Sequence, residues 1–162
     1  MGEQQNADEA LLKLNQDIFG KTGNGTLDFS LASTPDWEHH PNEEVLNVDI
    51  HDMDFNAIHV DALRSKNIKP FPTHSSVSNW ECQKNRSLFV NAFPECPLLG
   101  ADYQMYGQDY VFDPETAERF RNECERFQSI ELSPEADLAL RKLIYGCTEA
   151  SKKNMYLAWA CD

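Results

Sequence analysis

The chain has 162 residues, the length of one domain, and its 41% apolar and 25% charged residues are typical of a globular rather than a disordered protein. Its 14 Lys and Arg stand against 27 Asp and Glu, and the formal charge of -13 disfavours nucleic acid and anionic membrane surfaces as partners. The same charge favours cationic ligands, although an acidic surface that only keeps the protein soluble is the commoner explanation.

The start of the chain and its cysteines bear on its location. No apolar run approaches the roughly 20 residues that span a bilayer, and the first ten residues lack the basic start and apolar core of a signal peptide. We therefore expect a cytoplasmic protein with reduced thiols, no structural metal and no cofactor. The cysteines form no CxxC pair and have no His at zinc-finger spacing; they are Cys82, Cys96, Cys124, Cys147 and Cys161. Cys124 and Cys147 fall on apolar faces of predicted helices, which is typical of small core residues.

Residues 1–44 are expected to lead into the main domain. Asn6 and Glu9 form a capping box, and apolar residues then recur at helical spacing, which predicts an amphipathic helix over residues 7–19. Residues 20–31 match the centre of an EF-hand calcium loop but lack the acidic ligands at its ends. A Gly-rich turn that leads into a short strand is therefore the favoured interpretation, with a degenerate calcium site as the alternative.

An apolar run with acids at its end, residues 45–50, predicts the first strand of a parallel sheet. Asp49, Asp52 and Asp54 lie at the carboxyl end of this run, where α/β proteins collect ligand-binding and catalytic groups. Capping of the following helix is the alternative role of Asp52 or Asp54. The apolar face of that helix extends from Phe55 to the region of Leu63.

The next segment carries two prolines. Residues 68–74 predict an edge strand or an irregular strand, because Pro70 and Pro72 cannot donate to a ladder. Trp80 and Glu81 fall in the loop expected after it.

Two clear signals for the N-terminus of a helix occur in the rest of the chain. Residues 110–112 predict a strand that ends at Asp113, and Asp113 and Ser133 each precede a proline and a glutamate, which predicts helices from residues 114 and 134. A very short strand is expected at residues 130–132 and a final one at residues 155–160. The alternation of strands and helices over residues 45–162 predicts an α/β domain with a largely parallel sheet.

The acidic run after the first predicted strand has the form of a known motif. DIHDMD at residues 49–54 matches D-I-D-x-x-D with His51 in place of the middle acid, and Lys69 and Ser75 follow in the same order. Gly107, Gln108, Tyr110 and the pair Phe112-Asp113 resemble a later Gly-Glu-x-Trp-x-Asp motif, with glutamine in place of the glutamate. In these motifs the chain resembles the endo-α-1,4-polygalactosaminidase family of glycoside hydrolases.

Enzymes of that family are barrels whose catalytic carboxylates project from the carboxyl ends of strands. The resemblance implies a glycoside-hydrolase-like domain that cleaves or binds a polysaccharide of amino sugars, a cationic ligand that suits the charge. It assigns catalysis to Asp49, Asp54, Asp113 and Glu131, and substrate binding to Trp80, Glu81 and Tyr110. Because a full barrel takes about 250 residues, we expect a partial TIM-barrel-like fold or an open, largely parallel sheet, whose free edges pair in a homodimer. A truncated member of this family would be extracellular.

Two alternatives stay open. Since His51 and a glutamine replace acids of the motifs, a carbohydrate-binding relative without catalysis fits as well as an active enzyme. The other alternative is a small acidic interaction protein without an active site, whose carboxylates provide solubility and helix caps. The glycoside-hydrolase-like hypothesis requires Asp49, Asp54 and Asp113 to lie together at one end of the sheet, whereas the interaction protein does not.

Overall fold

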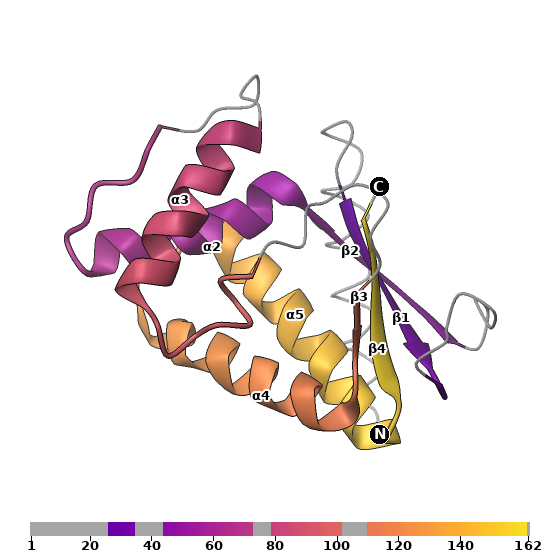
Figure 1. The fold of residues 1–162 in the computed structure, drawn as a ribbon. Coiled ribbons are helices and arrows are strands. Elements are labelled where there is room, and N and C mark those ends of the chain that lie inside the picture. Colours follow the sequence, from indigo (N-terminus) through magenta and orange to yellow (C-terminus); the bar gives the residue numbers. More distant parts are fainter. Residues whose placement is uncertain (1–25, 35–43, 73–78, 102–109, 162) are drawn as a thin grey trace.

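Figure 1 shows the fold in a computed structural model, which describes residues 26–34, 44–72, 79–101 and 110–161. These residues form four strands and four α-helices, in the order β1 (Thr26–Ala32), β2 (Glu44–His51), α2 (Asp52–Ser65), α3 (Asn79–Ala92), β3 (Tyr110–Phe112), α4 (Pro114–Glu125), α5 (Pro134–Lys153) and β4 (Tyr156–Cys161). A short 3-10 helix, η2 (Arg126–Ser129), follows α4 directly. Within the described ranges, no helix combines the length and the apolar character needed to cross a membrane.

The sheet is small and antiparallel. Its strand order is β2-β1-β4-β3, with β1 paired to both β2 and β4, and β3 paired to β4. The prediction of a partial TIM-barrel-like fold or an open, largely parallel sheet is therefore wrong, because every pairing between described strands is antiparallel. β1 comes from the segment expected only to lead into the domain, yet it is a central strand. The homodimer expected through free sheet edges stays a prediction.

Pairs of helices in the connections explain the strand directions. α2 and α3 lie between β2 and β3 along the chain, and α4 and α5 lie between β3 and β4. One helix returns the chain so that the next strand runs parallel to the last, whereas a second helix reverses the chain once more. The strands predicted at residues 68–74 and 130–132 made each connection look like a single helix. Residues 68–72 and 130–132 contain no strand.

The other predicted elements correspond well to the structure. The expected short strand after the Gly-rich turn is β1, the other confirmed strands are β2, β3 and β4, and the confirmed helices are α2, α4 and α5. Trp80 and Glu81 lie in α3 rather than in a loop. The helix predicted at residues 7–19 and the start of the calcium-like segment, residues 20–25, lie outside the described residues.

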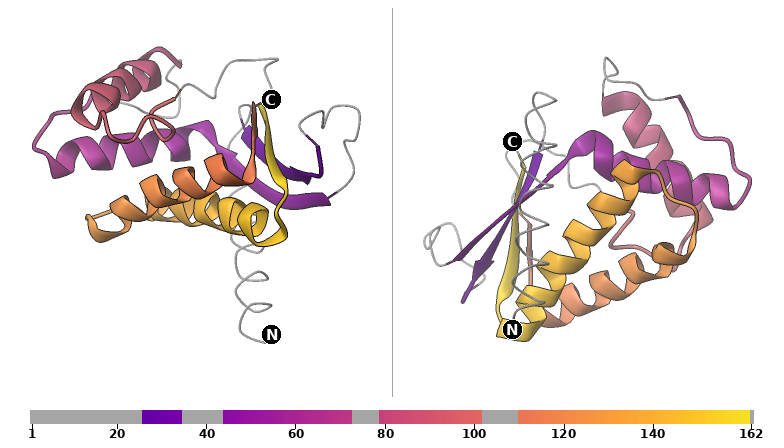
Figure 2. Two further views of the ribbon diagram at one scale, coloured as in Figure 1. Left: turned by 60° about the horizontal axis from the view of Figure 1, so that its bottom comes forward. Right: turned by 180° about the vertical axis from the view of Figure 1, so that it is seen from behind.

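The four helices lie on the same side of the sheet, as Figures 1 and 2 show. α5 is 20 residues long and packs against both α2 and α4. Phe29, Leu31 and Leu157 extend from the sheet into one core that they share with the buried faces of the helices. α5 approaches the sheet closely at Gly146, where an added Cβ would stand 3.2 Å from the ring of Phe29. The core therefore fixes one sheet face against the helical layer.

Candidate functional site

The strand register separates two of the predicted catalytic carboxylates. Asp49 of β2 pairs with Asp28, which in turn pairs with Ala160, whereas Asp113 follows β3 on the opposite edge of the sheet. Three strand spacings and about four residue steps along the strands put the Cα atoms of Asp49 and Asp113 about 20 Å apart. Glycosidase carboxylates stand about 5 to 9.5 Å apart. The structure thus does not bring this pair together.

The other predicted residues near the sheet lie on three different elements. Asp54 is half-buried in the first turn of α2, and Tyr110 is half-buried in β3, where it packs against the core. Trp80 and Glu81 lie in the first turn of α3, which begins at Asn79. Their assignment to one substrate site stays a prediction.

Glu131 lines a cavity of about 530 Å³ between the end of α2 and the start of α5. The other lining residues are Asp61, Arg64, Ser65, Ile130, Leu132 and Ser133. Asp61 is buried, and its Oδ2 accepts the backbone N–H of Ser133 at 2.8 Å, while Oδ1 lies 3.7 Å from Nη1 of Arg64. Asp61 therefore joins α2 to the start of α5, and Glu131 at the same cavity is exposed.

Asp113 caps a helix. Its Oδ1 accepts the backbone N–H of Thr116 at 2.7 Å, with Pro114 at the first helical position of α4. Hydrogen bonds from Thr116 lower the pKa of this exposed carboxyl group below its ordinary value. The contacts of Asp113 are those of an N-cap residue.

A different surface combines exposed apolar side chains with unusual local order. We name it the α3 ridge: helix α3 together with residues 66–72, which run alongside it. Phe71 and Val90 are the large apolar side chains that the described residues leave exposed, each at 40%, and both belong to this ridge. Phe71 lies between Pro70 and Pro72, which restrict the backbone there to extended conformations.

The buried amide of Asn85 holds the backbone of Phe71 on both sides. Asn85 Oδ1 accepts the N–H of Phe71 at 2.8 Å, and Asn85 Nδ2 donates to the carbonyl oxygen of Phe71 at 3.1 Å. Asn85 thereby reproduces the pair of hydrogen bonds that a neighbouring strand makes. Lys84 places its ammonium 5.1 Å from the centre of the Phe71 ring. The exposed phenylalanine is therefore presented on a fixed backbone.

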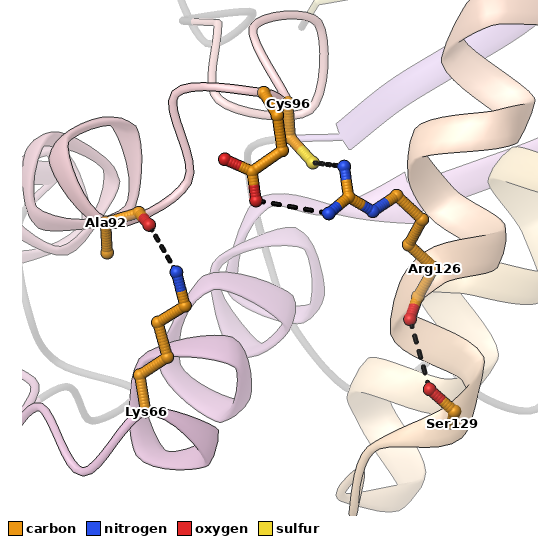
Figure 3. A network of polar contacts seen from close by, with 6 residues as sticks. Lys66, Ala92, Cys96, Arg126 and Ser129 are labelled. Carbon is orange, nitrogen blue, oxygen red and sulfur yellow. Dashed lines mark hydrogen bonds and ion pairs between the residues drawn. The ribbon is translucent and has the colours of Figure 1, made fainter.

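Lys66 and Arg126 hold the end of α3 and the turn that follows it (Figure 3). Lys66 Nζ donates to the carbonyl oxygen of Ala92 at 2.6 Å and lies 4.0 Å from the centre of the Phe93 ring. Arg126 donates from Nη2 to a carboxylate oxygen of Glu95 at 3.2 Å and from Nη1 toward Sγ of Cys96 at 3.8 Å. A cation at the carboxyl end of a helix is also favoured by the helix dipole.

The backbone of the turn after α3 makes further hydrogen bonds with side chains of α3 and α4. Glu123 of α4 accepts the backbone N–H groups of Leu98 and Leu99 at 3.0 and 2.9 Å, and burial raises the pKa of its carboxyl group. Arg86 donates to the carbonyl oxygen of Gly100 at 3.2 Å. Side chains from α3 and α4 thus hold this turn against the helical layer.

His59 is a core residue. Its ring lies 5.1 Å from the ring of Phe55 and 4.7 Å from that of Phe89, and Nε2 donates to the carbonyl oxygen of Leu99 at 2.9 Å. Burial lowers the pKa of His59 to about 4, against an opposing effect of the Leu99 hydrogen bond. At neutral pH this imidazole is uncharged and already engaged with the backbone.

The described thiols have the environment of structural cysteines. Cys82, Cys96, Cys124 and Cys147 are buried and form no disulfide bond. Burial raises the pKa of Cys96 to about 11 and raises those of Cys124 and Cys147 further above the ordinary range. In the segments that the structure describes, no three His, Cys, Asp or Glu side chains are grouped so that they could hold a metal ion.

Comparison with known proteins gives no relative: no family model, no curated protein and no solved structure matches this chain. The resemblance to polygalactosaminidases therefore stays a prediction, and the barrel that it implied is replaced by the antiparallel sheet.

Reasoning from the sequence missed the α3 ridge as a site. The sequence does show Phe71 between two prolines with lysines nearby, but this segment was interpreted as part of a strand over residues 68–74. The contact that fixes Phe71 joins residues 14 positions apart, and no periodicity predicts it.

Proposed function

We propose that this chain is a small acidic interaction protein without enzymatic activity, and that the α3 ridge is its binding surface. The observation that carries the proposal is the fixed presentation of exposed Phe71 by the paired hydrogen bonds of buried Asn85.

An isolated exposed apolar residue is common on soluble proteins and has no special meaning. Phe71 differs because its backbone is restrained by Pro70 and Pro72 and by the side chain of Asn85. Fixing a side chain before binding reduces the entropy that a partner's contact must offset, and aromatic residues are frequent hot spots of interfaces. These features favour recognition of a protein or peptide.

The positions of the chemical groups support a role without catalysis. Asp49 and Asp113 lie about 20 Å apart, and Asp113 serves as a helix cap. The buried thiols of Cys96, Cys124 and Cys147 have raised pKa values, whereas nucleophilic cysteines have lowered ones. The ring of His59 is buried and bonded to Leu99.

The binding role is testable with purified protein and a display library of random dodecapeptides. We expect wild type to enrich peptides that no longer bind a Phe71→Ser/Val90→Ser variant, because both substitutions remove exposed apolar contact area. The matched control, Asn122→Ser/Gln128→Ser, changes two exposed residues of α4 and η2 and should retain binding. Circular dichroism and thermal unfolding check that the variants fold. Equal binding to all three proteins, or no enrichment, would overturn the ridge as the binding surface.

The absence of catalysis is tested separately. Incubation with partially deacetylated galactosaminan, followed by mass spectrometry of the products, should show no shortened oligomers. Shortened oligomers that disappear with Asp49→Asn or Glu131→Gln would instead establish the glycosidase.

A further inference from the structure

The charge of the chain is strongly segregated along the sequence. Residues 62–94, which include the α3 ridge, contain five of the 14 basic residues but one of the 27 acidic residues, so their formal charge is +4 against -17 for the rest. The basic residues are Arg64, Lys66, Lys69, Lys84 and Arg86. A protein with a net charge of -13 therefore has a basic region at the same place as its exposed phenylalanine.

Several of these cations lie at the surface of the ridge. Lys66 and Lys69 are exposed. Arg64, which precedes the ridge in the last turn of α2, is also exposed, and its Nη1 lies 3.7 Å from Oδ1 of Asp61. Lys84 is half-buried with its ammonium beside the ring of Phe71. Arg86 is half-buried and donates to the carbonyl oxygen of Gly100, so its positive charge lies below the surface of the ridge. Lys84 thus lies beside the apolar side chain of Phe71, and Lys69 stands two residues before Phe71 in the chain.

The length of an anionic partner segment matters on such a molecule. At physiological salt the Debye length is about 8 Å, so charges near the contact decide the attraction. A short acidic segment meets mainly the basic ridge, whereas a long polyanion such as nucleic acid also extends over the acidic remainder of the surface and is repelled there. The distribution of charge favours an acidic segment of a protein over nucleic acid.

We infer that the α3 ridge recognises an acidic segment of a partner protein, with Phe71 packed against apolar side chains of that segment and Lys69 and Lys84 facing its carboxylates. This inference rests on the proposed binding function and adds the chemistry of the partner. An aromatic centre with a charged rim is typical of protein interfaces. Charged groups select the partner, and burial of apolar surface supplies the affinity.

The amino-acid composition of selected peptides tests the inference. From the random library, wild type should enrich peptides rich in Asp and Glu interspersed with Leu, Ile, Phe or Trp. Lys69→Glu/Lys84→Glu should weaken binding of such a peptide about tenfold, since each reversed surface charge changes affinity severalfold. The matched control, Arg119→Glu/Lys152→Glu, alters the net charge equally on α4 and α5 and should bind as wild type does. Fluorescence anisotropy with the labelled peptide measures these affinities.

The outcomes separate the two proposals. Peptides that depend on Phe71 but are neutral or basic would overturn the acidic partner and leave the binding surface in place. Peptides that bind all variants equally would overturn the binding surface itself. Labelled single-stranded DNA and RNA are measured in parallel, and ridge-dependent binding of either one more tightly than the acidic peptide would replace the protein segment with nucleic acid.

Discussion

His59 makes the stability of this fold depend on pH. Burial keeps the imidazole neutral in the folded state, with a pKa of about 4, whereas the ordinary histidine pKa of 6.5 applies when the chain is unfolded. Between these two pH values the unfolded chain binds the additional proton. The contribution of His59 is therefore fully present above pH 6.5 and is lost as the pH falls toward 4. At pH 5 the loss is about 2 kcal/mol.

His59→Phe should remove this part of the pH dependence. The wild type should lose about 2 kcal/mol more free energy of unfolding than the variant between about pH 7.5 and pH 5, as measured by urea unfolding. The variant itself should be about 1 to 3 kcal/mol less stable at the higher pH, because the carbonyl group of Leu99 loses its donor. Parallel pH profiles for the two proteins would assign the dependence to other groups.

Glu123 is expected to be the strongest single polar contact of the turn after α3. Glu123→Ala leaves the buried N–H of Leu99 and the neighbouring N–H of Leu98 without their acceptor, which should cost about 2 kcal/mol of unfolding free energy. Glu123→Gln retains one acceptor oxygen and should cost less. Equilibrium unfolding in urea measures both, and an alanine variant as stable as the wild type would show that water replaces the carboxylate without penalty.

Asn85 of α3 holds the segment that contains Phe71, and the effect of removing it can be measured at the backbone amide of Phe71. The N–H of Phe71 donates to Asn85 Oδ1, so its hydrogen exchange should be slow although the segment around it is exposed. Asn85→Leu keeps the buried volume but removes both hydrogen bonds, and the amide of Phe71 should then exchange about tenfold faster or more. Ser87→Ala, an exposed change on the same helix, serves as the control. Unchanged exchange in Asn85→Leu would mean that the prolines alone fix the segment.

The elements that were predicted correctly have local signals. An N-cap residue followed by proline and glutamate starts both α4 and α5, and these contacts are made within four residues. α3 lacks such regularity, because it buries polar Asn85 and exposes apolar Val90. Its pattern of apolar residues is therefore poor, although tertiary packing makes it a helix.

At the scale of the whole molecule, the predicted topology depended on how the connections between strands were interpreted, and the position of Asp113 relative to Asp49 depended on α3. With α3 counted as a strand and loop, the chain alternates like βαβ units, and the acids after β2 and β3 fall at the same end of a parallel sheet. With two helices in the connection, β3 runs opposite to β2, and Asp49 and Asp113 separate to opposite edges. The predicted catalytic site therefore required a strand direction that the sequence patterns could not decide. Charge segregation, in contrast, is independent of topology and was available from the sequence.

Cysteine reactivity should report unfolding of the whole molecule. Cys82, Cys96, Cys124 and Cys147 are all buried, from 0 to 4% exposed, and they come from α3, the turn after it, α4 and α5. Burial both blocks a reagent and, at the last three, raises the thiol pKa, so little thiolate is present at neutral pH.

In a Cys161→Ser background, these four thiols should react with Ellman's reagent at neutral pH only as fast as the molecule unfolds, and all four should react at once in denaturant. An added Asn122→Cys on exposed α4 surface should react immediately and verifies the reagent. Since the four thiols lie in one helical layer, they should be modified together, which intact-mass spectrometry detects as unmodified and fully modified chains without intermediates. Rapid modification of a single thiol would show that its helix opens independently and that the helical layer does not unfold as one unit.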